Sequence, residues 1–250
     1  DFDELTPRNA KWFKARHNVD VHTSHEVLRI DHAIKTVWVK NLLTGEIFED
    51  HYDLLVFATG ARYQTPEVFQ GHDFDNVFQV RNIHSGKVIK TYIDSHQPKT
   101  AVIVGAGYIG LEMAEQLKAQ GIDVTVLQRG QHPMPHLDWD MSIRIEDEMR
   151  KQGIHFRPEE TIAEVSGTTR LESAVTTKGE VLEADLYIIA TGVLPNTALA
   201  TSIGVDLGET GAIVTDSTMQ TNLEGVYAVG DVAESFHVIT GKPIYRPMAT

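Results

Sequence analysis

The sequence predicts an α/β protein that contains two related units of strands and helices. Three observations lead to this prediction. A glycine-rich turn lies between an apolar run and a helical pattern, a segment that ends in Ala-Thr-Gly occurs twice, and a third segment ends in Gly-Asp. Because strands alternate with helices around the glycine-rich turn, we expect a parallel sheet whose connections are right-handed crossovers.

The glycine-rich turn has the form Gly-x-Gly-x-x-Gly and follows a β-branched run at residues 100–104. Gly105 would allow the tight turn, Gly107 would let a pyrophosphate approach the backbone, and Gly110 would let helix and sheet pack closely. The pyrophosphate would bind the unpaired N–H groups at the start of the helix. A second strand at residues 123–127 completes a dinucleotide-binding βαβ unit. The predicted cofactor-binding residues of the turn are Gly105, Ala106, Gly107, Ile109 and Gly110.

The end of that second strand bears on which nucleotide binds. NAD-binding units have an acidic residue there, which binds the ribose 2′-hydroxyl. This chain has Gln128 and Arg129 instead, and both are predicted to bind the cofactor. A carboxylate would repel a 2′-phosphate, whereas an arginine can pair with it, so the sequence favours NADPH or tolerance of both nucleotides. The alternative is that Arg129 is a solvated loop charge.

Two segments of the chain follow one plan. Residues 45–60 and 179–192 both begin with Gly-Glu, continue through apolar and acidic residues, and end in a mostly apolar run and Ala-Thr-Gly. Each predicts a hairpin that leads into a buried strand, whose end turns beneath a nucleotide. We therefore predict two related dinucleotide-binding, Rossmann-like domains. The predicted cofactor-binding residues of these turns are Ala58, Thr59, Gly60, Ala190, Thr191 and Gly192.

The first of these domains is predicted to be truncated. Equal spacing in the two units would place the first unit's glycine-rich turn before Asp1, and residues 1–60 contain no Gly-x-Gly-x-x-Gly. We therefore expect this chain to be a piece of a longer protein.

A third segment, residues 221–232, predicts a turn and a short apolar strand that ends at Gly230 and Asp231. An aspartate there can accept hydrogen bonds from the hydroxyls of a polyol, and the backbone beyond it can face a phosphate. Both residues are predicted to bind a cofactor. The alternative is an ordinary aspartate in a turn.

Together these motifs resemble the pyridine nucleotide-disulfide oxidoreductases, which are flavoproteins with two dinucleotide-binding domains. Within them the chain looks most like the coenzyme A disulfide reductase and NADH oxidase branch. The resemblance covers nearly all 250 residues. It rests on the four motifs at residues 58–62, 105–112, 190–196 and 223–231.

The resemblance implies roles for single residues. Asp231 would bind the ribitol of the flavin, and the Ala-Thr-Gly turn at residues 58–60 would lie near FAD. The backbone around Val27 would hold the adenine. Tyr108 and Glu112 are the predicted catalytic residues, because they match the residue that gates the nicotinamide pocket and the glutamate close to the nicotinamide and the flavin. The alternatives are a tyrosine that packs on the helix and a solvated carboxylate.

The resemblance also implies an activity. The parent protein would be an FAD-dependent NAD(P)H oxidoreductase, with FAD and NADP or NAD as cofactors. It would pass a hydride from nicotinamide to flavin and on to a small disulfide or persulfide, such as that of coenzyme A, or to oxygen. Two other interpretations stay open: an NAD(P)-binding piece without turnover, and an electron carrier that resembles ferredoxin reductases.

Parts of the family pattern are expected outside the chain. The redox cysteine of this branch would lie upstream of residues 5–7, and a domain that makes the parent protein a homodimer would begin after residue 250. The chain departs from the family at Leu194, where Arg or Lys is usual, so a nucleotide or surface contact would be lost or rerouted.

The composition bears on other classes of function. A net charge of −13 without a Lys/Arg cluster argues against a nucleic-acid partner, and no apolar run reaches membrane-spanning length. The absence of cysteine excludes thiolate chemistry within this chain, and we expect a cytoplasmic protein. No metal site is predicted. Prolines disrupt the helix that would align His132 with His136, and His22 and His25 would lie on opposite faces of a strand.

The predicted elements place the domain boundaries. We expect a partial FAD-binding domain at residues 1–96 and 218–250, with an NAD(P)-binding domain at residues 97–217 inserted into it. Expected strands are 19–30, 36–41, 46–58, 100–104, 123–127, 154–157, 161–166, 171–176 and 180–189; expected helices are a short one within 1–14, then 82–95, 108–120 and 139–152.

Overall fold

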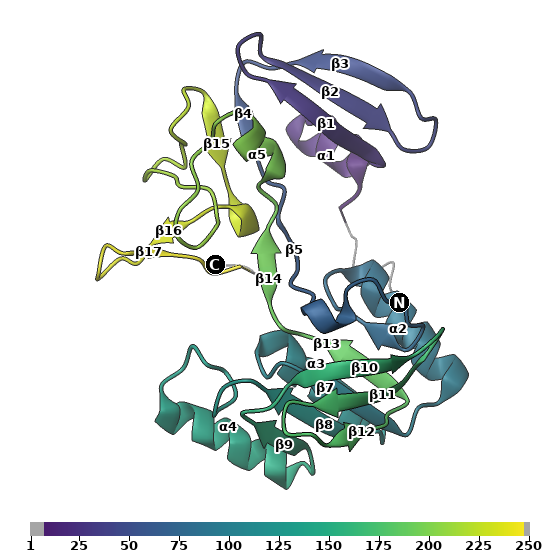
Figure 1. Ribbon diagram of the computed structural model, residues 1–250. Helices are drawn as coiled ribbons and strands as arrows, with labels where there is room; N and C mark the ends of the chain where they lie inside the picture. Colours follow the sequence, from purple (N-terminus) through teal and green to yellow (C-terminus); the bar gives the residue numbers. More distant parts are fainter. Residues whose placement is uncertain (1–7, 248–250) are drawn as a thin grey trace. The chain divides into compact units, whose positions relative to one another are not determined.

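The computed structural model describes residues 8–247 and divides the chain into two compact units. The first consists of Asp1–Arg62 and Val193–Thr250, and the second is Tyr63–Gly192 (Figure 1). A discontinuous first unit with the second inserted into it follows the predicted plan. The segments at residues 5–7 and 248–250, on which the sequence comparison drew, lie outside the described residues.

The limits of the units differ from the predicted boundaries at 96/97 and 217/218. Helix α2 (Ile83–His96) belongs to the second unit, because its Ile89 and Tyr92 pack into the same core as Ile103. The polar segment at residues 96–99, where the boundary was predicted, therefore lies within that unit. Conversely, Val205 and Ile213 pack into the core of the first unit.

The second unit is built on a five-stranded parallel sheet in the order β6-β13-β7-β8-β9. Its strands are β6 (Val77–Phe78), β7 (Thr100–Val104), β8 (Asp123–Gln128), β9 (His155–Pro158) and β13 (Leu186–Ile189). Helices α3 (Tyr108–Ala119) and α4 (Trp139–Lys151) connect β7 to β8 and β8 to β9. The parallel sheet and the predicted βαβ unit are confirmed.

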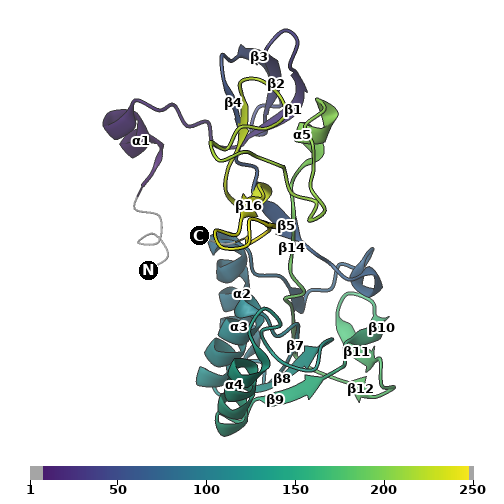
Figure 2. The ribbon, with the colours of Figure 1, turned by 90° about the vertical axis from the view of Figure 1, so that its left-hand side faces the viewer.

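Both faces of this sheet are buried, which explains why its central strands β7 and β13 are almost wholly apolar. Ala101 and Ile103 of β7 face a core shared with α2, α3 and α4, whereas Val102 and Val104 face a second core. An antiparallel sheet covers that second face; it consists of β10 (Ile162–Gly167), β11 (Leu171–Thr176) and β12 (Val181–Leu182). Figure 2 shows the helices and this small sheet on opposite sides of β7–β9.

The first unit contains an antiparallel sheet and a separate parallel strand pair. β1 (His25–Asp31), β2 (Thr36–Asn41) and β3 (Ile47–His51) form the antiparallel sheet, and β4 (Leu55–Phe57) pairs with β15 (Val226–Ala228). The remaining elements of the chain are α1 (Ala10–His17), β5 (Ala61–Tyr63), η2 (Glu67–Phe69), β14 (Val193–Pro195), α5 (Ala198–Ser202), η3 (Gly230–Val232), β16 (Ser235–Phe236) and β17 (Pro243–Ile244).

The internal repeat is visible in the order of the strands. In each unit a three-stranded antiparallel sheet is followed by a short strand that pairs in parallel with its neighbours: β1–β3 then β4, and β10–β12 then β13. The strands predicted at 46–58 and 180–189 are each two strands, since the chain must leave one sheet before it joins the next. The strand predicted at 19–30 begins only at His25. Within residues 8–247 no helix combines the length and the apolar character needed to cross a membrane.

Candidate nucleotide-binding sites

The three glycines of the turn after β7 have three different surroundings. Gly105 has φ +108°, and a Cβ there would lie 2.3 Å from the carbonyl oxygen of Ala190. A Cβ on Gly110 would lie 1.9 Å from the carbonyl oxygen of Gly105. A Cβ on Gly107 would meet no atom within 4 Å. Two glycines are therefore required by the fold itself, and the third leaves open space beside the backbone, as a closely approaching pyrophosphate requires.

The start of α3 offers donors beside that open space. Gly107 is the N-cap residue and provides no side-chain cap. The first intrahelical bond runs from Leu111 N–H to Gly107 O at 3.0 Å, and the N–H groups of Tyr108, Ile109 and Gly110 have no acceptor among the described residues. Three unpaired donors at the positive end of a helix dipole form an anion site.

Ala106 has a different role from the neighbouring glycines. Its N–H donates to Gln128 Oε1 at 3.1 Å, and its carbonyl accepts from Met134 N–H at 2.8 Å. The residue is fully buried. Gln128 and Ala106 were both predicted as cofactor ligands, and the structure shows that they bind each other and hold the turn against the end of β8.

The sheet brings the predicted binding segments of the second unit together. Ala190 N–H donates to Val104 O, and Gly105 N–H donates to Leu127 O, each at 2.8 Å. The carboxyl ends of β13, β7 and β8 thus lie side by side, and the order of the strands reverses between β7 and β13. This reversal point is where open α/β sheets bind ligands.

The remaining predicted residues of this unit lie around the turn. Tyr108 is 53% exposed, and Glu112, four residues later on α3, is also exposed. Arg129 is exposed, and its side chain makes no ion pair or hydrogen bond with the described residues. Thr191, in contrast to these three residues, has a side-chain partner within the chain, because its hydroxyl donates to Gln64 O. Gly192 has a left-handed backbone, with φ +108°.

The predicted flavin segments of the first unit also meet at one sheet edge. The Ala58-Thr59-Gly60 turn follows β4, and Gly230 and Asp231 follow the adjacent β15. The two ends are joined by a hydrogen bond from Val229 N–H to Phe57 O at 2.9 Å. Tyr245 donates its hydroxyl to Asp231 O at 2.9 Å and so fixes the backbone of that turn.

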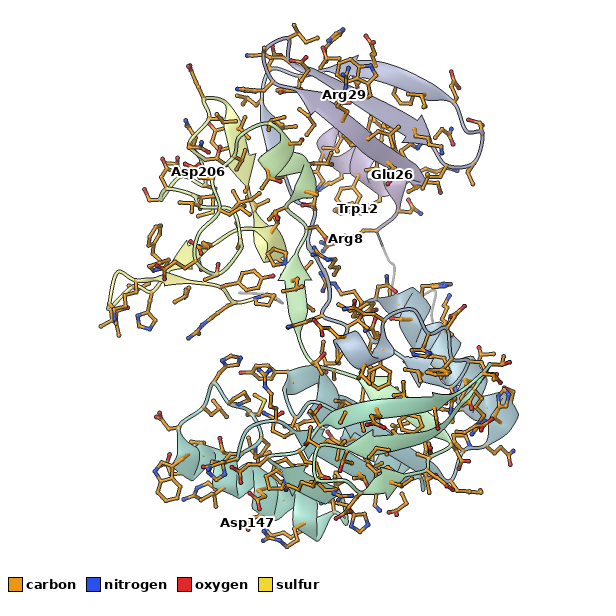
Figure 3. All side chains as sticks on the ribbon, in the orientation of Figure 1. Arg8, Trp12, Glu26, Arg29, Asp147 and Asp206 are labelled. Carbon is orange, nitrogen blue, oxygen red and sulfur yellow. The ribbon has the colours of Figure 1, made fainter. Side chains whose placement is uncertain are left out.

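Val27 lies elsewhere in the first unit, on β1 within the antiparallel sheet. The register of β1 against β2 shifts between Val27 and Arg29, which marks a bulge. Figure 3 labels Glu26 and Arg29 on this strand. The strand pairs that carry the Ala-Thr-Gly and Gly-Asp turns do not include β1.

Sequence reasoning missed a buried carboxylate close to Asp231. Glu234 is 3% exposed and accepts a hydrogen bond from the hydroxyl of Thr210. A Cβ on Gly208 would lie 2.1 Å from Glu234 Oε1, so this glycine makes room for the carboxylate. The glycines and polar residues at 208–211 are typical of a turn, but no sequence pattern predicts that Glu234 packs against that turn.

One prediction about histidines was wrong. His22 lies before β1 begins, so it does not alternate with His25, and the two rings are 5.3 Å apart in an edge-to-face arrangement. Within residues 8–247 no group of three or more His, Cys, Asp or Glu residues is placed to hold a metal ion.

Comparison with known proteins gives relatives over almost the whole chain. A CoA-dependent NAD(P)H sulfur oxidoreductase of Pyrococcus abyssi is 41% identical over 238 residues, which are 95% of this chain and 52% of the relative. A coenzyme A disulfide reductase of Staphylococcus haemolyticus is 34% identical over 247 residues, 98% of this chain and 54% of the relative. The chain thus spans about half the length of these relatives.

Solved structures agree with these relatives. A NAD-dependent persulfide reductase from A. fulgidus superimposes with a TM-score of 0.90 at 34% identity, over 96% of this chain and 44% of that chain. The family described as "Pyridine nucleotide-disulphide oxidoreductase" matches residues 3–248. This chain therefore belongs to the pyridine nucleotide-disulphide oxidoreductase family.

Proposed function

We propose that this chain is part of an FAD-dependent NAD(P)H oxidoreductase that reduces a small disulfide or persulfide, such as that of coenzyme A, or oxygen. The names of the relatives support this proposal, since they include CoA-dependent sulfur oxidoreductases, coenzyme A disulfide reductases and an NADH oxidase. The second unit, Tyr63–Gly192, would act as the NAD(P)-binding part, and the first unit would act as the FAD-binding part. We further propose a cytoplasmic parent protein that is a homodimer.

The second unit would hold the nicotinamide nucleotide. The N–H groups of Tyr108, Ile109 and Gly110 would bind the pyrophosphate, which the open space beside Gly107 admits. Arg129 would pair with a 2′-phosphate. The backbone of the turn at residues 190–192 would border the same site, with Gln128 and Ala106 keeping the turn in place.

The first unit would hold part of the flavin. Asp231 would accept hydrogen bonds from the ribitol hydroxyls, the turn at residues 58–60 would line the same edge, and the backbone at Val27 would hold the adenine. When bound, the nicotinamide supplies a hydride and the flavin accepts it. Tyr108 and Glu112 would shield and orient the nicotinamide end, since both are exposed on α3 directly after the phosphate-binding turn.

The observation that carries the proposal is the contrast between Gly107 and its two neighbouring glycines. Gly107→Ala introduces no clash within the chain, and its φ of −85° suits alanine, so the protein should keep its thermal stability. The added methyl group would occupy the space for the pyrophosphate and weaken the binding of NADPH and NADH by about tenfold or more. Gly86→Ala on α2 is the matched control, because a Cβ there also meets nothing within 4 Å.

The measurement is a fluorescence titration of each purified protein with NADPH and NADH, with a melting curve on the same samples. Binding to wild type and to Gly86→Ala, and its loss in a folded Gly107→Ala, is the expected result. Equal affinity of all three proteins would contradict the proposed site.

A piece that binds NAD(P) without turnover is the second candidate function. It is favoured by the presence of the glycine-rich phosphate-binding turn in the second unit alone among residues 8–247. The visible absorption spectrum of the purified protein, after incubation with FAD and desalting, separates the two. Retained flavin bands that bleach on addition of NADPH favour the oxidoreductase, including an electron carrier of the ferredoxin reductase type. A colourless protein that still binds NADPH favours the binding piece.

A further inference from the structure

The turn after β9 lies beside the loop after β8, at the predicted ribose end of the nucleotide site. Two backbone hydrogen bonds join the residues that follow β9 to the end of β8 and the loop after it. Glu160 N–H donates to Gln128 O at 2.9 Å, and Glu159 N–H donates to Gly130 O at 3.0 Å. Glu159 is therefore the direct neighbour of the residue that follows Arg129.

The side chain of Glu159 lies along the same loop. Its Oε1 accepts a hydrogen bond from Gln131 Nε2 at 3.3 Å, and the side chain is exposed. The backbone of Glu159 is left-handed, with φ +54°, so the chain turns at this residue. An exposed carboxylate thus lies beside the loop after β8, which itself has no acidic residue at positions 128–131.

The other charges nearby are already neutralised within the chain. Glu160 is buried and pairs with Arg157 Nε at 2.9 Å, with Lys178 Nζ 3.9 Å away. Arg157 also pairs with Glu180. Arg129 and Glu159, whose charges have opposite signs, form no ion pair with the residues that the structure describes.

We propose that Glu159 is a specificity-determining residue, which weakens the binding of a nucleotide with a ribose 2′-phosphate relative to one with a free 2′-hydroxyl. The inference rests on the proposed function, since it assumes that the nucleotide occupies the turn after β7. A carboxylate accepts a hydrogen bond from a hydroxyl but repels a phosphate dianion. Arg129 attracts the same phosphate, so the two residues oppose each other and the site accepts both nucleotides.

Glu159→Gln tests this with little change in shape, because glutamine keeps an oxygen that can accept from Gln131. We expect NADPH to bind on the order of fivefold more tightly, as for one unit charge removed near a phosphate at a partly solvated site. NADH affinity should stay within about twofold. The gain for NADPH should shrink as salt is raised from 20 mM to 500 mM, roughly a fivefold change in Debye length. Glu159→Lys should raise the affinity for NADPH further than Glu159→Gln does.

Glu164→Gln on β10 is the matched control, since Glu164 is exposed and removal of its charge alters the net charge equally. Fluorescence titrations of the wild type and the three variants with NADH and NADPH give the ratio of the two affinities. An unchanged ratio in Glu159→Gln, or an equal change in Glu164→Gln, overturns the inference while the proposed function stands. If the wild type binds neither nucleotide, the proposed function fails, and the role of Glu159 fails with it.

Discussion

Thr59 and Asn196 exchange two hydrogen bonds although they are 137 residues apart in the sequence. The hydroxyl of Thr59 donates to Asn196 O at 2.7 Å, and Asn196 Nδ2 donates to Thr59 O at 2.9 Å. The second Ala-Thr-Gly turn repeats part of this arrangement. There Thr191 donates its hydroxyl to Gln64 O, and Gln64 N–H donates to Gly192 O at 2.9 Å, just as Asn196 N–H donates to Gly60 O. Each threonine thus binds the segment that follows the other repeat.

This arrangement predicts a stability role for both threonines. Thr59→Val and Thr191→Val should each lower the free energy of unfolding by about 0.5–1.5 kcal/mol, the net value of a single hydrogen bond. Asn196→Ala should lower it by a similar amount, because it removes the single side-chain bond to Thr59 O and keeps the backbone oxygen that accepts from the Thr59 hydroxyl. Denaturant unfolding measures these differences. Thr168→Val is the control, since this threonine is exposed and its side chain makes no hydrogen bond with the described residues, and it should leave the free energy of unfolding unchanged. Equal effects at Thr168 and Thr59 would argue against the pairing.

The part of the fold that could be predicted from the sequence is the part whose signals are local. The run at residues 100–104, the three glycines and the amphipathic helix are consecutive, so one turn and its packing are specified within about 20 residues. The domain boundaries, in contrast, depend on packing between segments that are distant in the sequence. Gln97 and Pro98 suggest a linker, and only the packing of Tyr92 against the sheet shows that α2 belongs to the second unit.

The same distinction applies to the candidate site. Gly105 and Asp231 were predicted as site residues because a motif surrounds each of them. The bond between Gln128 and Ala106 spans 22 residues, so no local pattern predicted that the side chain of Gln128 holds the turn. Glu159 belongs to no motif, and only the pairing of the loops after β8 and β9 places it near Arg129. Side chains that act through tertiary contacts leave no periodic signal in the sequence.

Arg129 provides a direct test of nucleotide preference. If it pairs with a 2′-phosphate, Arg129→Ala should weaken NADPH binding by about 1.5–3 kcal/mol, as charged hydrogen bonds do, and leave NADH nearly unchanged. Isothermal titration with each nucleotide gives both values. Arg144→Ala, which removes an equal charge from α4, serves as the control. Similar losses for NADPH and NADH would show that Arg129 acts on the fold or on a part common to both nucleotides.

Asn76 should be among the polar residues most important for the stability of the second unit. It is fully buried, its Nδ2 donates to Leu171 O at 3.1 Å, and its Oδ1 accepts from Leu171 N–H at 2.8 Å. Asn76→Ala leaves a buried donor and a buried acceptor without partners, so the free energy of unfolding should fall by about 2–4 kcal/mol. Asn41→Ala, whose side chain caps an exposed turn, should cost about 1 kcal/mol or less. Chemical denaturation of both variants measures these losses in the free energy of unfolding. Equal losses would contradict the role of the buried Asn76 hydrogen bonds.

Asp185 should make the stability of the second unit depend on pH in the acid range. Its pKa is held below the ordinary value, first by the backbone N–H of Lys99 and then by the N–H and hydroxyl of Thr100 and the charge of Arg170, against an opposing effect of burial. A group whose folded pKa is depressed stabilises the protein above its unfolded pKa of about 3.9, and this stabilisation is lost as the pH falls through the lower folded value.

Asp185→Asn should therefore lower the free energy of unfolding at pH 7 by about 1 kcal/mol, since the carboxylate is partly exposed and its bonds to Lys99 and Thr100 are weakened rather than removed. The difference between wild type and variant should shrink below about pH 4, where the carboxylate of the wild type becomes protonated. Urea unfolding at pH 7, 5, 4 and 3 measures it. Asp73→Asn, which removes the same charge from an exposed side chain without a hydrogen bond or ion pair to the described residues, is the matched control. A gap between wild type and Asp185→Asn that stays constant down to pH 3 would show that the charge of Asp185 does not stabilise the fold.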